Sequence, residues 1–286
     1  MDSQTISRRR DELAARFGPW TAHNIELAPG VMTMPGRGDT FAAQFARILR
    51  TARDIIPGPV ETWRVLDIGC LEGYYSVEFA RLGAEVVGLE GREGNVAKSQ
   101  LAKEALGLGR LSFVQADALE LSEERFGRFD LIVCYGLLYH LDWPDVFTFS
   151  ERMAAVCDRL ALIATHIALR AEVTRTHGGR TYHGSTFKEH ETDASEEERE
   201  RSAWASLRDP ESFWPTRASL YNILTDAGFT SVFRFHDPTQ KLPDRDTLVA
   251  LKGEGEPLAE RWPEEPPKVV TLRRRVARRL ARLVLD

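Results

Sequence analysis

The chain has 286 residues, of which 43% are hydrophobic and 28% are charged, and its formal net charge is -5 at pH 7. This is the composition of a globular protein large enough to bury a substantial core, as one elaborated α/β domain or as one domain with a small cap. The negative net charge argues against a protein that is basic over its whole surface and binds nucleic acid, although it is compatible with a local basic patch.

The three cysteines, Cys70, Cys134 and Cys157, are far apart and form no Cys-x-x-Cys pair. We therefore expect no zinc site, and the histidine spacing matches no metal-binding helix motif. The first ten residues contain no apolar signal core. No segment approaches the roughly 20 apolar residues that a membrane helix needs. These features predict a cytoplasmic protein with no integral membrane segment and no bound metal.

The first 58 residues are expected to form an N-terminal helical or lid segment. A charged helix is predicted over 5–17, and apolar spacing predicts a second helix over 41–55. Between them, glycine and proline punctuate residues 18–40, which indicates irregular chain with a short hairpin around 23–33.

Apolar strands then alternate with amphipathic helices over residues 59–255, the main predicted domain. Strands are predicted at 64–68, 85–89, 111–115, 129–134, 159–166, 231–236 and 247–251. Helices are predicted at 74–82, 95–106, 144–156 and 216–227. This pattern is typical of a Rossmann-like α/β fold with a seven-stranded, mostly parallel sheet and helices on both faces.

Two segments break this pattern. Residues 170–215 contain three histidines and an acidic run at 189–200. We interpret this segment as a lid insertion and the run as a solvated helix face or a loop. Residues 256–286 are expected to form a linker and a basic C-terminal helix. Such a helix can dock on its own domain, pair with a second subunit in a homodimer, or contact an anionic membrane surface or RNA.

Polar and glycine residues follow the first four predicted strands of the sheet. The first strand enters a turn containing Gly69 and Gly73, residues that permit close backbone approach. Glu90 ends the second strand, where Rossmann-type sites place an acidic residue that binds ribose hydroxyls. Asp117 follows the third strand and Tyr135 the fourth. Open α/β sheets bind ligands at this edge, so these residues predict one cofactor site.

The order of these motifs resembles the class I S-adenosylmethionine-dependent methyltransferase family over roughly residues 60–255. The resemblance implies S-adenosylmethionine as cofactor, with Glu90 at its ribose and Asp117 near its adenine. Leu71 departs from the family pattern, which often has another glycine there. The cofactor-binding residues that the resemblance implies are Asp67, Gly69, Cys70, Gly73, Tyr74, Glu90, Gly91, Asp117, Ala118 and Tyr135.

A second, local resemblance involves the runs Gly73-Tyr74-Tyr75-Ser76 and Leu138-Tyr139-His140-Leu141. These runs look like those of the wobble-uridine tRNA carboxymethyltransferase group, which uses a carboxylated form of the cofactor. Residues 23–45 lack the Trp-basic-Trp signature expected of that group. We therefore expect a relative that uses ordinary S-adenosylmethionine on a different acceptor.

His140 is the candidate catalytic residue, because it follows the fourth strand, where this fold presents the acceptor to the methyl group. A hydroxyl or amine acceptor must lose a proton, and histidine accepts one near neutral pH. His140 could instead cap a turn. Glu72 could face the same crevice or be solvated. Further candidates for the site or its cover are His23, Tyr75, His177, His183, Arg180, Trp204 and Arg217.

The sequence thus predicts methyl transfer to a hydroxyl or amine of a small molecule or glycan, because a lid encloses small ligands well. Two alternatives stay open. One is a tRNA-modifying methyl- or carboxymethyltransferase, and the other is a non-catalytic scaffold that binds the cofactor.

Overall fold

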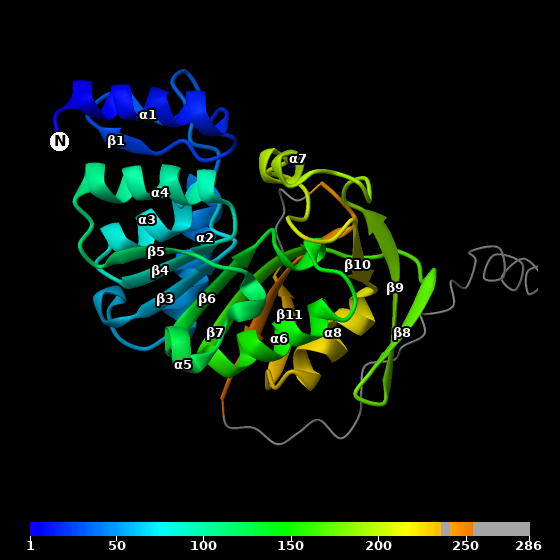
Figure 1. Ribbon diagram of the computed structural model, residues 1–286. Helices are drawn as coiled ribbons and strands as arrows, with labels where there is room; N and C mark the ends of the chain where they lie inside the picture. The colour runs from blue at the N-terminus through cyan, green and yellow to red at the C-terminus, as the bar shows by residue number, and fades with distance from the viewer. Residues whose placement is uncertain (236–240, 254–286) are drawn as a thin grey trace, which may run out of the picture.

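The computed structural model describes residues 1–235 and 241–253, which fold around a seven-stranded sheet (Figure 1). The strand order is β11-β12-β7-β6-β3-β4-β5. Strands β3 to β7 are parallel, and β12 and β11 extend the sheet in antiparallel fashion. The predicted fold class is confirmed. The strands are β3 (Arg64–Ile68), β4 (Glu85–Glu90), β5 (Leu111–Gln115), β6 (Phe129–Tyr135), β7 (Cys157–His166), β11 (Ser231–Phe235) and β12 (Arg245–Leu251).

Helices cover both faces of this sheet, which explains why its strands are almost continuously apolar. Along β6, Leu131 packs into one core and Ile132 into the other, as the alternation of strand side chains requires. One face carries α2 (Ala42–Ile55), α3 (Tyr74–Arg81) and α4 (Glu93–Leu106), and the other carries α5 (Glu123–Phe126), α6 (Asp145–Val156) and α8 (Arg217–Asp226).

The N-terminal segment contains the predicted helix and hairpin. Helix α1 (Ser3–Phe17) and the hairpin of β1 (Glu26–Ala28) and β2 (Val31–Met32) lie against α4, outside the sheet (Figure 1). The chain then passes to α2 and through a short 3-10 turn, η1 (Val60–Thr62), into β3.

Glu72 anchors this N-terminal segment. Its carboxylate is fully buried and accepts hydrogen bonds from the backbone N–H groups of Thr21 (2.6 Å), Ala22 (3.2 Å) and His23 (3.0 Å). The Lys98 ammonium lies 3.6 Å away and is also buried. Both interpretations of Glu72 from sequence are therefore wrong, since it faces neither the crevice nor solvent but binds a segment about 50 residues upstream.

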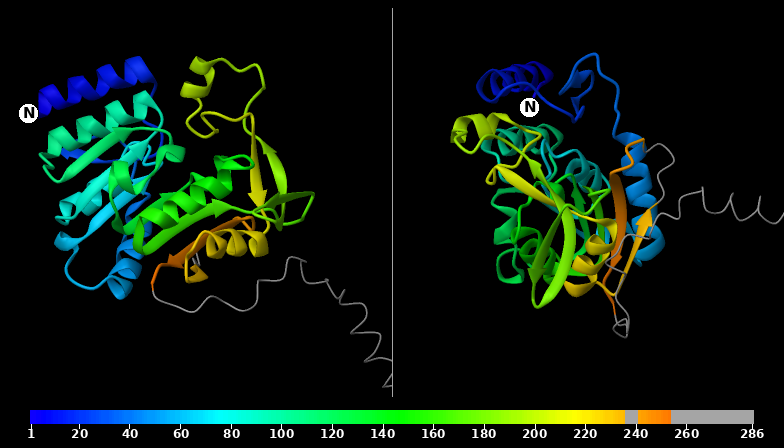
Figure 2. Two further views of the ribbon diagram at one scale, coloured as in Figure 1. Left: turned by 60° about the horizontal axis from the view of Figure 1, so that its bottom comes forward. Right: turned by 90° about the vertical axis from the view of Figure 1, so that its right-hand side faces the viewer.

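The insertion has regular structure that the periodicity did not reveal. Strands β8 (Val173–His177), β9 (Arg180–Lys188) and β10 (Glu211–Pro215) form an antiparallel sheet in the order β10-β9-β8, with helix α7 (Glu196–Arg201) between β9 and β10. This small sheet lies beside the carboxyl ends of β6 and β7 (Figure 2). Phe213 N–H donates to the Leu141 carbonyl (2.9 Å), which ties β10 to the short 3-10 helix η3 (Leu138–His140).

The predicted linker and C-terminal helix, 256–286, lie outside the described residues, and so do their expected contacts with a second subunit, a membrane surface or RNA. Within residues 1–235 and 241–253, no helix combines the length and the apolar character needed to span a bilayer.

We predict that Glu72→Gln lowers the free energy of unfolding by about 3–5 kcal/mol, because Lys98 then stays buried without its carboxylate. Chemical denaturation followed by circular dichroism measures this change. Glu12→Gln is the matched control, since Glu12 pairs with Arg8 on the surface and its loss should change stability by less than about 0.5 kcal/mol. Equal effects of the two substitutions would contradict the anchoring role.

Candidate active site

A cavity of about 720 Å³ lies at the carboxyl edge of β3, β4, β5 and β6, beneath residues 203–209 of the insertion. Its volume suits a cofactor together with part of a small second ligand. His140 lines it, and so do most of the predicted cofactor-binding residues, namely Asp67, Gly69, Cys70, Glu90, Gly91, Asp117, Ala118 and Tyr135.

Gly73 and Tyr74 do not line this cavity, in contrast to the expectation. Gly73 has φ +84°, and a Cβ at this position would lie 2.7 Å from Phe113 Cζ, so the glycine serves the packing of α3 on the sheet. The Tyr74 hydroxyl donates to Asp39 instead (2.6 Å). Of the two adjacent tyrosines, Tyr75 is the one that reaches the cavity.

The turn after β3 explains the family's preference for glycine at position 71. Leu71 has φ +50°, a left-handed conformation that costs a non-glycine residue roughly 1–2 kcal/mol. In this conformation its N–H donates to Glu90 Oε2 (2.9 Å), and Arg92 N–H donates to Glu90 Oε1 (2.9 Å). Two backbone donors thus orient a buried carboxylate whose remaining lone pairs suit the two hydroxyls of a ribose.

Asp67 lines the cavity and is almost fully buried. Its carboxylate accepts hydrogen bonds from the Ser76 N–H (3.0 Å) and hydroxyl (2.6 Å). Burial outweighs these bonds and raises the pKa of Asp67 to about 7. A cation that binds here would favour the ionised form, so binding and proton release are coupled.

His23 enters the same cavity from the N-terminal segment that Glu72 anchors. Its Nδ1 accepts a hydrogen bond from Tyr74 N–H (3.2 Å), and burial lowers the pKa of the ring to about 4. The imidazole is therefore neutral at physiological pH, with its proton on Nε2 as a hydrogen-bond donor.

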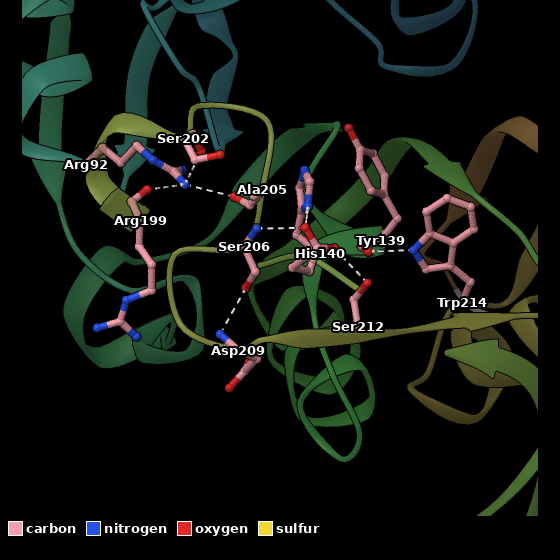
Figure 3. A network of polar contacts seen from close by, with 11 residues as sticks. Arg92, Tyr139, His140, Arg199, Ser202, Ala205, Ser206, Asp209, Ser212 and Trp214 are labelled. Carbon is pink, nitrogen blue, oxygen red and sulfur yellow. Dashed lines mark hydrogen bonds and ion pairs between the residues drawn. The ribbon is translucent and has the colours of Figure 1, made fainter. Parts of the chain in front are cut away.

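His140 is paired with a buried carboxylate. Its Nδ1 lies 2.9 Å from Glu189 Oε2, and the exposed fraction of the Glu189 side chain is only 1%. Glu189 also accepts hydrogen bonds from Ser206 N–H (2.8 Å) and the Ser212 hydroxyl (2.7 Å). Figure 3 shows His140 between Ser206 and Tyr139, and Trp214 beside Tyr139, whose carbonyl accepts a hydrogen bond from Trp214 Nε1 (2.9 Å).

This pairing determines what His140 can do. Because the carboxylate accepts the Nδ1 proton, Nε2 is left as the unprotonated nitrogen that can accept another. Burial alone would raise the pKa of Glu189, but its hydrogen bonds and the nearby His140 hold that pKa below the usual value. The carboxylate is thus ionised at neutral pH and can stabilise a protonated imidazole, as in other carboxylate–histidine pairs.

Sequence reasoning missed Glu189, because it begins the acidic run that we interpreted as a solvated face or loop. That interpretation is wrong for Glu189, which is buried. A hint was present in the position of Glu189 next to the β-branched and aromatic residues of 180–188, which are typical of a strand.

Two arginines hold in place the cover of the cavity, residues 203–209 of the insertion. The Arg92 guanidinium donates to the carbonyls of Ser202 (2.9 Å) and Ala205 (2.8 Å), as Figure 3 shows. Arg208 pairs with Asp117 (3.1 Å) and Asp145 (3.1 Å). The cover therefore lies directly over the predicted ribose and adenine positions, and Trp204 within it lines the cavity.

Four other candidates lie outside the cavity. His177 contacts Glu151, and His183 contacts Thr174. Arg180 pairs with Asp226, and Arg217 with Asp246, so neither arginine is available to an acceptor there.

The arginines that do line the cavity are Arg92, Arg208 and Arg245. Within the described part of the chain, no group of three or more His, Cys, Asp or Glu side chains could hold a metal ion.

Comparison with known proteins agrees with this geometry. Residues 65–159 match a family model described as a methyltransferase domain. The chain is 33% identical over 134 residues to a ubiquinone biosynthesis O-methyltransferase of Ruegeria sp., which is 46% of this chain and 51% of that protein. A protein of the same name from Acinetobacter baumannii is 30% identical over 81 residues, which is 28% of this chain and 34% of that protein. The chain thus spans about half the length of the first of these relatives and about a third of the second.

A solved structure is similar over a larger part of the chain. It is the N-terminal domain of EvdMO1 in the presence of S-adenosylhomocysteine (SAH) and D-fucose, with 28% identity and a TM-score of 0.69. The alignment covers 88% of this chain and 98% of that domain. These similarities confirm a methyltransferase domain over residues 65–159 and S-adenosylmethionine as the predicted cofactor, while the predicted domain bounds, 59–255, stay a prediction.

We predict that the affinity for SAH rises by about tenfold between about pH 6 and about pH 8. Below its pKa of about 7, Asp67 is protonated and cannot attract the cationic ammonium group of this ligand, whereas above it the carboxylate is ionised. Calorimetry over this pH range, in buffers of different ionisation enthalpy, measures both the affinity and the proton release. Asp67→Asn should abolish the pH dependence, and the exposed control Asp54→Asn should keep it. A pH-independent affinity of the unmodified protein would rule out this coupling.

Proposed function

We propose that this chain is an S-adenosylmethionine-dependent O-methyltransferase that acts on a hydroxyl group of a small molecule or sugar. The observation that carries the proposal is the His140–Glu189 pair, in which His140 lines the same cavity as Glu90 and Asp67 and Glu189 holds its ring from outside. A hydroxyl acceptor must lose a proton during transfer, and a histidine oriented by a carboxylate is suited to accept it.

Each group of residues around the cavity would have its own role in such a reaction. S-adenosylmethionine supplies the methyl group. Glu90 would orient the ribose and Asp67 would attract the cationic end of the cofactor. The rings of Tyr75 and Tyr135, whose centroids are 5.6 Å apart, would stabilise the sulfonium charge. His140 Nε2 would accept the hydroxyl proton, and the cover at 203–209 would exclude water.

The acceptor class is supported by what the relatives are called. The curated relatives are O-methyltransferases, and the EvdMO1 domain was crystallised in the presence of a sugar. Both names favour an oxygen acceptor over the amine that the sequence left open. The cover over the cavity also favours an acceptor that fits inside.

A tRNA acceptor is the second candidate. The run Leu138–Leu141, which looks like that of the wobble-uridine group, forms η3 at the cavity wall. This candidate predicts tRNA binding that weakens steeply with salt. Binding of SAH without methyl transfer to any probe would instead favour the non-catalytic scaffold.

The cofactor part of the proposal is tested with Glu90→Ala. We expect this change to weaken SAH binding by about 10- to 100-fold, since it removes hydrogen bonds to a charged group. The exposed Glu124→Ala is the control and should bind SAH like the unmodified protein. If the unmodified protein fails to bind SAH in calorimetry, the proposed function is wrong.

The catalytic part is tested with His140→Ala and Glu189→Gln. We expect His140→Ala to lower kcat by about 10²- to 10⁴-fold without changing SAH affinity. Methyl transfer to D-fucose and to catechol, followed by SAH release, provides the assay. Glu189→Gln should lower kcat and alter the pH profile of the base, which loss of packing alone would not do. The control is His183→Ala, outside the cavity. Full activity of His140→Ala would exclude it as the base.

A further inference from the structure

Arg245 lies at the acceptor end of the cavity. It begins β12 and is opposite His166, the last residue of β7. Because β12 is antiparallel to β7, its first residue lies at the same edge of the sheet as the carboxyl ends of β3 and β6. Arg245 therefore lines the cavity together with Tyr135, Tyr139 and His140, on the side away from Asp117.

The carboxylates nearest to Arg245 in sequence are bound to other groups. Asp244 contacts His166 (3.2 Å). Asp246 pairs with Arg217 (2.5 Å) and lies 3.7 Å from Arg234. Glu189, the carboxylate behind the cavity-lining His140, is bound to that histidine. None of the ion pairs found among residues 1–235 and 241–253 includes Arg245.

The surroundings of Arg245 are instead aromatic. Its guanidinium carbon lies 5.9 Å from the centroid of the Tyr139 ring, and the residue is half-buried. Among the described residues no carboxylate pairs with this half-buried guanidinium, so an anion that binds here would neutralise a charge that is partly removed from water. Its planar set of donors fits a carboxylate or a phosphate with two parallel hydrogen bonds.

We propose that Arg245 binds an anionic oxygen group of the acceptor, so that the molecules methylated here carry a carboxylate or phosphate in addition to the reacting hydroxyl. This inference rests on the proposed function and assigns its substrate class. Arg245 would hold the anionic end of the acceptor while His140 faces the hydroxyl, which fixes the orientation in which the oxygen meets the methyl group. The cationic cofactor and the anionic acceptor also attract each other in the covered site.

The test measures binding of simple probes to the full chain saturated with SAH. Benzoate and phenyl phosphate are the anionic probes, and benzyl alcohol is the neutral one. We expect both anions, or one of them, to bind at least about tenfold more tightly than benzyl alcohol. Arg245→Met should remove this preference, whereas Arg245→Lys should keep part of it because the charge remains. Whichever anion binds more tightly identifies the group as carboxylate or phosphate.

The control is Arg159→Met, which removes an exposed arginine at the other end of β7. It should leave anion binding unchanged. SAH binding is measured first in every variant. If the unmodified chain does not bind SAH, the proposed function itself fails. If SAH binds but the anions bind no better than benzyl alcohol, or equally well to Arg245→Met, only the present inference is overturned.

Two further outcomes would assign Arg245 to the cofactor and so overturn the inference. One is a loss of SAH affinity in Arg245→Met, which would mean that the guanidinium binds the amino-acid carboxylate of the cofactor. The other is tighter binding of a carboxylated S-adenosylmethionine than of the ordinary cofactor, with that preference lost in Arg245→Met.

Discussion

The contact between Glu189 and His140 joins the inserted sheet to the parallel sheet. A carboxylate this deeply buried is tolerated only when donors surround it, and here the donors come from η3, from residue 206 and from β10. Satisfying one buried charge therefore brings three segments to one place. The position of the base, the start of the cover and the attachment of the small sheet all depend on this contact.

The same physical rule shapes the rest of the site. Asp67, Glu72 and Glu90 are buried at or near the carboxyl edge of the sheet, and all three accept hydrogen bonds from backbone N–H groups. Of the three, Asp67 and Glu90 line the cavity, and their carboxyl groups are already oriented and desolvated before a cationic ligand binds there. Arg245 differs from these carboxylates, because it is a cation at the same edge and no anionic partner for it is found among the described residues.

The elements of the main sheet could be predicted because their signals are local. Strand and helix periodicity located β3 to β7 to within a few residues, and ligand residues at strand ends follow from parallel topology alone. Gly73 shows the limit of this reasoning. Its place in the glycine turn was predicted correctly. A glycine is needed there, however, because the ring of Phe113 on β5 leaves no room for a Cβ, and not because a ligand approaches. Spacing in the sequence does not distinguish contact with a ligand from contact with a neighbouring side chain.

Glu72 and Glu189 were misjudged because their partners lie far away in the chain. Glu72 binds backbone 49 to 51 residues upstream, and His140 binds Glu189 49 residues downstream. An acidic residue carries the same sequence signal whether it is solvated or buried, so only the tertiary partner decides between the two. The strands of the insertion were missed for a related reason, since their register is set by pairing with one another and with η3.

The attachment of the insertion also limits how such an enzyme can diversify. The segment 189–212 contains both the cavity-lining residues 203–209 and Glu189, the carboxylate that orients His140. A chimera that received this segment from a relative would change selectivity and proton transfer in a single step. Engineering a new acceptor preference by exchanging the segment would therefore require a carboxylate at the position of Glu189, with both of its serine partners in register.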